Sequence, residues 1–83
     1  MNSMELSFAR QRKKRTQQQM AGVIKKSLDS YSKKERDKVS FSPDEIVAVT
    51  LDLELTFDQM NDIFFDGHLP FRKSGSEALP PTP

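Results

Sequence analysis

The sequence has no cysteine, only one histidine and no long apolar run. Without cysteine, disulfides, thiolate zinc sites and cysteine nucleophiles are excluded together. No apolar stretch approaches the length of a signal-peptide core or of a membrane span. The simplest expectation is a cytoplasmic protein that has no membrane contact.

The residue patterns of common catalytic and metal sites are also missing. His68, the single imidazole, has no cysteine partners and is poor evidence for a metal. The chain contains no glycine-rich phosphate loop and no pair of carboxylates placed for a cleft. A Ser–Lys peptidase dyad needs a sheet-built second domain, for which a chain of 83 residues has no room. We expect no enzyme activity, no cofactor, no metal and no small-molecule substrate.

The sequence does contain a charge asymmetry, which its formal net charge of +1 hides. Residues 1–40 carry eleven basic and four acidic side chains, a balance of +7, whereas residues 41–83 have a balance of −6. A basic half suits a phosphate backbone, and an acidic half keeps the rest of the molecule away from it. Solvated helix faces explain such charge runs about as well in general. The interpretation that the basic half binds phosphates is favoured only if that half also contains the pattern of a nucleic-acid-binding motif.

The length of the chain predicts one small domain, stabilised by helix caps and local propensity as well as by its core. We assign the domain to residues 1–71. Residues 72–83 are rich in Pro and Ser and poor in apolar side chains, so they are expected to form a disordered tail.

Helix-start signals divide the domain into five expected helices. Ser42-Pro43-Asp44-Glu45 and Thr56-Phe57-Asp58-Gln59 are capping boxes, and the first also has Pro at the first helical position. Thr16 and Ser27 are further N-caps. The expected helices cover about 4–14, 17–24, 28–36, 43–53 and 57–66. A strand over 47–55 is a minor alternative, and the capping boxes on either side of it argue against it.

Residues 17–36 have the layout of a helix-turn-helix. The small Ala21 stands where two helices press together, while Met20, Ile24 and Tyr31 occupy apolar positions. Ser27 follows as the cap of the second helix. Polar and basic residues fill the remaining positions, as in a DNA-reading motif.

The same residues carry a family resemblance. Thr16-Gln17, Ala21, Ile24, Ser27, Tyr31 and Glu35-Arg36, then a capped helix and the segment 53–63, resemble the lambda-repressor-like helix-turn-helix domains, and in particular small Cro-type phage repressors. The resemblance covers residues 4–67. It implies an all-α, five-helix DNA-binding domain that acts as a sequence-specific regulator of transcription. Such a repressor blocks a promoter by occupying a double-stranded DNA operator.

The resemblance also implies which residues meet DNA. The base-reading positions fall on Leu28, Asp29, Ser32 and Lys33. The phosphate-binding positions fall on Gln17, Lys26, Ser27, Arg36 and Lys38. Asp29 also suits the N-terminal end of a helix without any DNA, and Gln17 has an ordinary solvent-facing alternative. Arg10 is as easily explained by a pair with Glu35 as by a phosphate contact.

Three residues depart from the family pattern at the helix ends. Lys25 stands where the family prefers Gly, because that residue often has positive φ. Lys26 replaces a core aliphatic residue, and Asp37 replaces a Gly that commonly ends the third helix. These substitutions leave the geometry of the turn open.

The C-terminal part of the domain is expected to mediate assembly. One end of so small a core cannot bury all of its large apolar side chains, so we expect a weak homodimer through the fifth helix and the loop after it. The interface residues are Phe57, Phe64, Phe65, Leu69 and Phe71. The competing functional class is a protein-interaction module, such as an anti-repressor or antitoxin that kept the fold.

Overall fold

The computed structural model describes residues 1–70, which form five α-helices. The helices are α1 (Ser3–Arg12), α2 (Gln17–Ile24), α3 (Leu28–Glu35), α4 (Pro43–Asp52) and α5 (Phe57–Phe65). The all-α, five-helix expectation is confirmed for this part of the chain, where the minor strand alternative at 47–55 is wrong. Phe71 and the expected disordered tail lie outside the described residues.

Each helix begins at a side-chain cap. The cap residues are Asn2, Thr16, Ser27, Ser42 and Thr56, and each accepts a hydrogen bond from the backbone N–H three residues later. The helices α2, α4 and α5 have complete capping boxes, in which Gln19, Glu45 and Gln59 return the hydrogen bond. Local chemistry therefore sets the start of every helix.

Each helix is followed by a residue in the left-handed region, and none of these residues is glycine. They are Lys14 (φ 57°), Lys25 (61°), Asp37 (64°), Glu54 (55°) and Asp66 (53°). For an L-residue this conformation costs about 1–2 kcal/mol. The left-handed conformation of Lys14 cannot continue a helix, which explains why α1 ends at Arg12, two residues before the predicted end.

One core holds the five helices together. Its largest fully buried side chains are Leu6, Met20, Tyr31, Val49 and Leu53, which come from or directly follow α1, α2, α3 and α4. In addition, the ring of Phe41 makes edge-to-face contacts with the rings of Tyr31 and Phe64, at centroid distances of 6.1 and 5.3 Å. Such contacts between aromatic rings stabilise the fold by more than the burial of their apolar area alone.

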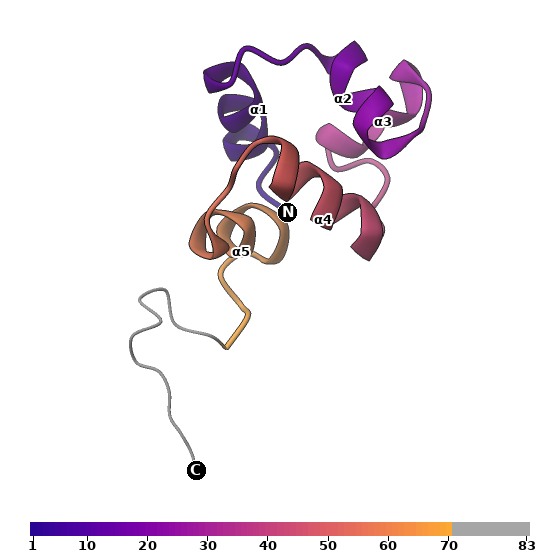
Figure 1. The fold of residues 1–83 in the computed structure, drawn as a ribbon. Helices are drawn as coiled ribbons and strands as arrows, with labels where there is room; N and C mark the ends of the chain where they lie inside the picture. The colour runs from indigo at the N-terminus through magenta and orange to yellow at the C-terminus, as the bar shows by residue number, and fades with distance from the viewer. Residues whose placement is uncertain (71–83) are drawn as a thin grey trace.

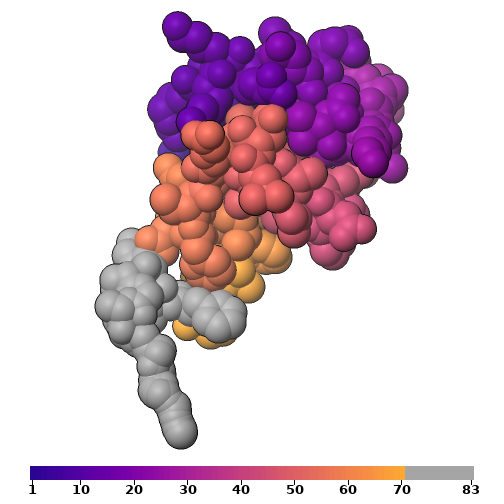
Figure 2. Space-filling view, in the orientation of Figure 1, coloured from indigo at the N-terminus to yellow at the C-terminus, as the bar shows by residue number. Residues whose placement is uncertain are grey.

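The helices are arranged so that α2 and α3 form one end of the molecule and α5 the other (Figure 1). The helix α2 packs against α3 and α4, and α1 contacts α3 and α5. The N-terminal segment joins the α5 end, because the backbone N–H of Asn2 donates to the carbonyl of Ile63 at 2.7 Å. In the space-filling view residues 1–40, indigo to magenta, lie along the top and right of the molecule, and residues 41–70, red to orange, lie at its centre and below (Figure 2).

Candidate nucleic-acid interface

A tight turn of three residues, Lys25 to Ser27, joins α2 to α3. Lys25 adopts the left-handed conformation that the family resemblance implies for this position, although it is not glycine. The backbone N–H of Lys26 donates to the carbonyl of Ala21 at 2.9 Å, which closes the end of α2. The hydroxyl of Ser27 then accepts from the N–H of Ser30 at 3.1 Å and starts α3.

The helix α3 has one buried and one open face. Tyr31, Lys34 and Glu35 are buried. Leu28, which is 42% exposed, lies with the exposed Asp29 and Lys33 on the other face, and Ser32 is partly exposed. The four expected base-reading residues therefore all keep solvent access on the same helix. Lys33 Nζ lies 3.1 Å from Asp29 Oδ2, one helical turn away.

The orientation of α3 relative to α1 and α2 depends on the carboxylate of Glu35. Its Oε1 accepts from Arg10 Nε at 2.8 Å and from the hydroxyl of Tyr31 at 2.7 Å. Its Oε2 accepts from Gln17 Nε2 at 3.0 Å and from Arg10 Nη2 at 3.2 Å. The pair between Arg10 and Glu35, which the resemblance implied as one alternative, is therefore present between α1 and α3, and the hydrogen bond from Gln17 adds α2 to the same cluster.

These contacts set the protonation of the cluster. Burial alone would raise the pKa of Glu35, but the hydrogen bonds from Arg10, Tyr31 and Gln17 outweigh it and lower the pKa below its ordinary value. Burial, together with the hydrogen bond to Glu35, raises the pKa of the Tyr31 phenol. Glu35 is therefore an anion and Tyr31 a neutral donor at neutral pH.

Gln17 has a contact with α3 that agrees with part of the role implied by the family resemblance, in which the first residue of the second helix contacts phosphate and also supports the reading helix. Its side chain is half-buried, and its amide donates inward to Glu35 rather than pointing only to solvent. The backbone N–H of Gln17 remains at the N-terminal end of α2, where helix termini favour anions. The structure thus assigns the side chain a role in positioning α2.

A second buried ion pair, Lys34 with Glu45, joins α3 to α4. Lys34 Nζ donates to Glu45 Oε1 at 2.7 Å and to Oε2 at 2.8 Å, and the N–H of Ser42 also donates to Oε1. Burial raises the pKa of Glu45, but the hydrogen bonds from Lys34 and Ser42 outweigh this effect and lower it. The sequence predicted Glu45 only as a capping residue. One feature of the sequence could have indicated this ion pair: Lys34 lies on the same buried face of α3 as Tyr31, where a lysine needs an acidic partner.

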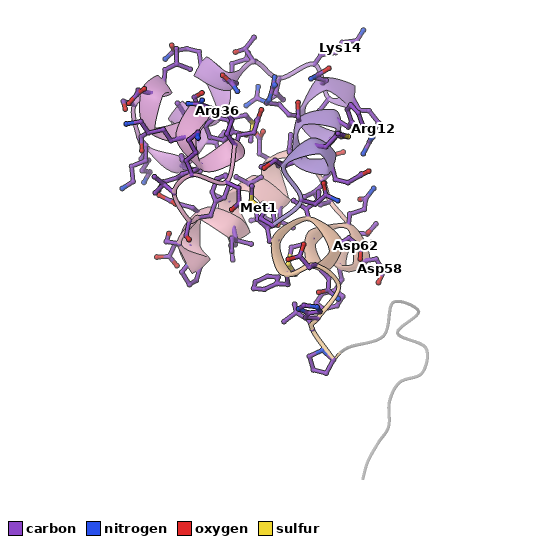
Figure 3. The ribbon with its side chains drawn as sticks, turned by 180° about the vertical axis from the view of Figure 1, so that it is seen from behind. Met1, Arg12, Lys14, Arg36, Asp58 and Asp62 are labelled. Carbon is purple, nitrogen blue, oxygen red and sulfur yellow. The ribbon has the colours of Figure 1, made fainter. Side chains whose placement is uncertain are left out.

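The expected phosphate-binding residues lie around the two ends of α3. Lys26, Ser27, Arg36 and Lys38 are all exposed, with Ser27 and Lys26 before the helix and Arg36 and Lys38 after it. Lys26 Nζ also lies 3.8 Å from Glu45 Oε2, whereas Lys13 and Arg15 pair closely with Glu54 at 2.6 Å and Asp52 at 3.0 Å. Arg36 lies at the α2–α3 end of the molecule, while Asp58 and Asp62 lie on α5 at the other end (Figure 3).

The expected assembly residues on and after α5 differ in exposure. Phe57 is 37% exposed, whereas Phe64, Phe65 and Leu69 are partly buried. Phe64 already packs against Phe41, and the backbone N–H of Leu69 donates to Asn61 Oδ1 at 3.0 Å. The core thus uses more of this aromatic cluster than composition alone indicated.

Within residues 1–70, no three His, Cys, Asp or Glu side chains are placed together to hold a metal ion. No helix among these residues is both long and apolar enough to cross a membrane. Comparisons of the chain with protein-family models, with curated proteins and with solved structures give no match.

Proposed function

We propose that this protein is a sequence-specific regulator that binds double-stranded DNA through α2 and α3, in the manner of small Cro-like phage repressors. The observation that carries the proposal is the register of α3. Its buried face joins the core through Tyr31, while its open face holds the polar and basic residues that suit a major groove. In this mechanism the protein covers an operator in the cytoplasm and excludes polymerase from the promoter.

Base reading is assigned to the open face of α3. Lys33 donates to guanine O6 and N7, and Asp29 accepts from cytosine N4. Leu28 contacts a thymine methyl group, and the hydroxyl of Ser32 hydrogen-bonds to a donor or an acceptor on a base edge. The ion pair between Asp29 and Lys33 must open for these contacts to form. Exposed pairs of this kind contribute about 1 kcal/mol or less, so DNA can replace this one readily.

Anchoring is assigned to the two ends of α3 and the start of α2. Lys26, Arg36 and Lys38 supply positive charge, and Gln17 and Ser27 supply hydrogen-bond donors to phosphate. Phosphate contacts fix the orientation of a protein on the duplex without reading its sequence. Two copies then place two α3 helices about 34 Å apart on a near-palindromic site.

The proposal is tested by selecting binding sites from random duplexes and titrating the selected duplex with salt. If each subunit neutralises about three to five phosphates, the logarithm of the affinity falls against log salt with a slope of about −3 to −5 per subunit. A slope near zero, or no duplex binding at low salt, contradicts the proposal. The competing class, a protein-interaction module, predicts that no sequence is enriched.

A further inference from the structure

The open face of α3 carries one acidic side chain among its polar and basic residues. Glu35, the other acid of α3, is buried, so Asp29 is the only acid that this helix exposes. Lys33 Nζ lies 3.1 Å from Asp29 Oδ2, and the two side chains are 50% and 74% exposed. Arg36 and Lys38, by contrast, have no ion-pair partner among residues 1–70. An acid that occupies a lysine of the proposed reading face is unexpected on a surface that meets a polyanion.

This ion pair presents a hydrogen-bond donor and an acceptor side by side. Residues four apart on a helix are neighbours, and acid before base is the favourable order. A nucleic acid that replaces the contact between Asp29 and Lys33 must therefore offer an acceptor to the ammonium and, close beside it, a donor to the carboxylate. A phosphate group offers only acceptor oxygens. It satisfies Lys33 but leaves Asp29 facing another negative charge.

A single G·C base pair supplies both groups at a matching distance. Guanine presents the acceptors O6 and N7 in the major groove, and cytosine presents the N4 donor. Because O6 and N4 are hydrogen-bonded to each other, they lie about 2.9 Å apart, close to the 3.1 Å between Lys33 Nζ and Asp29 Oδ2. The two inverted base pairs turn guanine O6 or thymine O4, both acceptors, toward Asp29. A T·A pair turns adenine N6 toward Asp29, but the acceptor N7 lies next to it.

We propose that Asp29 and Lys33 act as one unit that accepts a single G·C base pair, with guanine on the Lys33 side, and disfavours every other contact. This role rests on the proposed function and extends it, because it makes Asp29 a specificity-determining residue that works mainly by exclusion. On any other sequence the carboxylate keeps the Lys33 ammonium to itself and faces acceptors. Specific recognition often depends on such repulsive elements as well as on attractive ones.

Binding of the selected operator and of a random duplex tests this role. Asp29→Ala is expected to bind random DNA about tenfold more tightly near 0.1 M salt, since the freed Lys33 neutralises about one more phosphate. Operator binding should not improve by this factor, so the ratio of the two affinities falls. Asp62→Ala is the matched control: it removes the same charge from α5, at the other end of the molecule (Figure 3), and should leave the ratio unchanged.

A double-variant cycle tests the coupling between the two side chains. In the wild-type background Lys33→Ala is expected to change binding to random DNA little, because Asp29 already occupies the ammonium. In the Asp29→Ala background the same substitution should remove the roughly tenfold gain. Asp29→Asn is a second variant of similar size, and it should shift the preference at this base pair toward adenine, whose N6 and N7 suit an amide. Circular dichroism checks that each variant keeps its helical content.

The outcomes separate this role from the proposed function. A wild type that enriches no sequence from random duplexes overturns the proposed function, and the role of Asp29 with it. If the wild type enriches an operator, but Asp29→Ala strengthens binding to operator and random DNA by the same factor, only the role of Asp29 is overturned. An effect of Lys33→Ala on random DNA that is the same in both backgrounds overturns it too.

Discussion

Lys34 Nζ lies between the two carboxylate oxygens of Glu45, 2.7 and 2.8 Å from them, and both side chains are buried. This ion pair fixes α3, the proposed reading helix, against α4. A buried pair adds little net stability compared with an apolar pair of the same shape, but removing one partner leaves an uncompensated charge. The pair therefore matters most for how α3 is placed.

Glu45→Gln is expected to lower the free energy of unfolding by about 3–5 kcal/mol, because the ammonium group of Lys34 then stays buried without its counter-charge. Glutamine can still complete the capping box of α4. Urea denaturation measures the change. Glu54→Gln is the matched control, since Glu54 pairs with Lys13 at the surface, and it is expected to change little. Adding Lys34→Met to Glu45→Gln should recover most of the loss; no recovery would contradict the explanation.

Lys25→Gly is expected to stabilise the domain by about 1 kcal/mol, because glycine adopts the left-handed conformation of this turn without strain. Lys25 is exposed, so little packing is lost. Thermal unfolding measures the change. Lys26→Gly is the comparison, since Lys26 has no positive φ; there glycine should be neutral or destabilising by about 0.5–1 kcal/mol. Equal effects of the two substitutions would rule out backbone strain as the cause.

Lys33→Ala is expected to weaken operator binding by about 1–3 kcal/mol and to leave binding to random DNA nearly unchanged, because a base contact carries sequence information. Lys38→Ala should weaken binding to both DNAs alike and reduce the salt slope by about one unit. Competition binding with the two duplexes separates the variants. Lys13→Ala, whose charge already pairs with Glu54, serves as the control. If Lys33→Ala and Lys38→Ala behave alike, the assigned reading register is wrong.

The acid stability of the domain should depend on Glu35. Its folded-state pKa is lowered, so its contribution to stability is fully present above the ordinary value of 4.5 and is lost as the pH falls through the folded pKa. Glu35→Gln is therefore expected to be less stable than wild type at neutral pH, and the difference should shrink below about pH 4.5. Urea unfolding at several pH values measures it. A constant difference across the acid range would contradict the assignment.

The starts of the helices were predictable because caps act over three residues. Ser42 with Glu45 and Thr56 with Gln59 form their hydrogen bonds within one turn, whatever surrounds them. The left-handed Lys25 was implied by the family resemblance, which marks that position for glycine. Sequence reasoning also placed Tyr31 in the core, because the apolar positions of a helix-turn-helix are few and regularly spaced.

Contacts between helices were harder to predict. The pair of Lys34 and Glu45 joins residues eleven apart, and only the packing of α4 on the rest of the domain brings them together. The inward hydrogen bond of Gln17 to Glu35 also depends on tertiary packing. Composition predicted exposed apolar surface on α5, where Phe57 is 37% exposed but Phe64 packs against Phe41, and it did not predict the exposure of Leu51 on α4.

The separation of charge along the molecule has a consequence for how it approaches other molecules. Residues 1–40 carry a balance of +7, and residues 41–70 carry seven acidic and no basic side chains, so the described part has no formal net charge but an excess of each sign on a different part of the chain. Near a polyanion such a molecule experiences a torque more than a net attraction. If the proposed DNA interface is correct, we expect this torque to turn the α2–α3 end toward the duplex before contact, and ionic strength to set how often an encounter begins in that orientation.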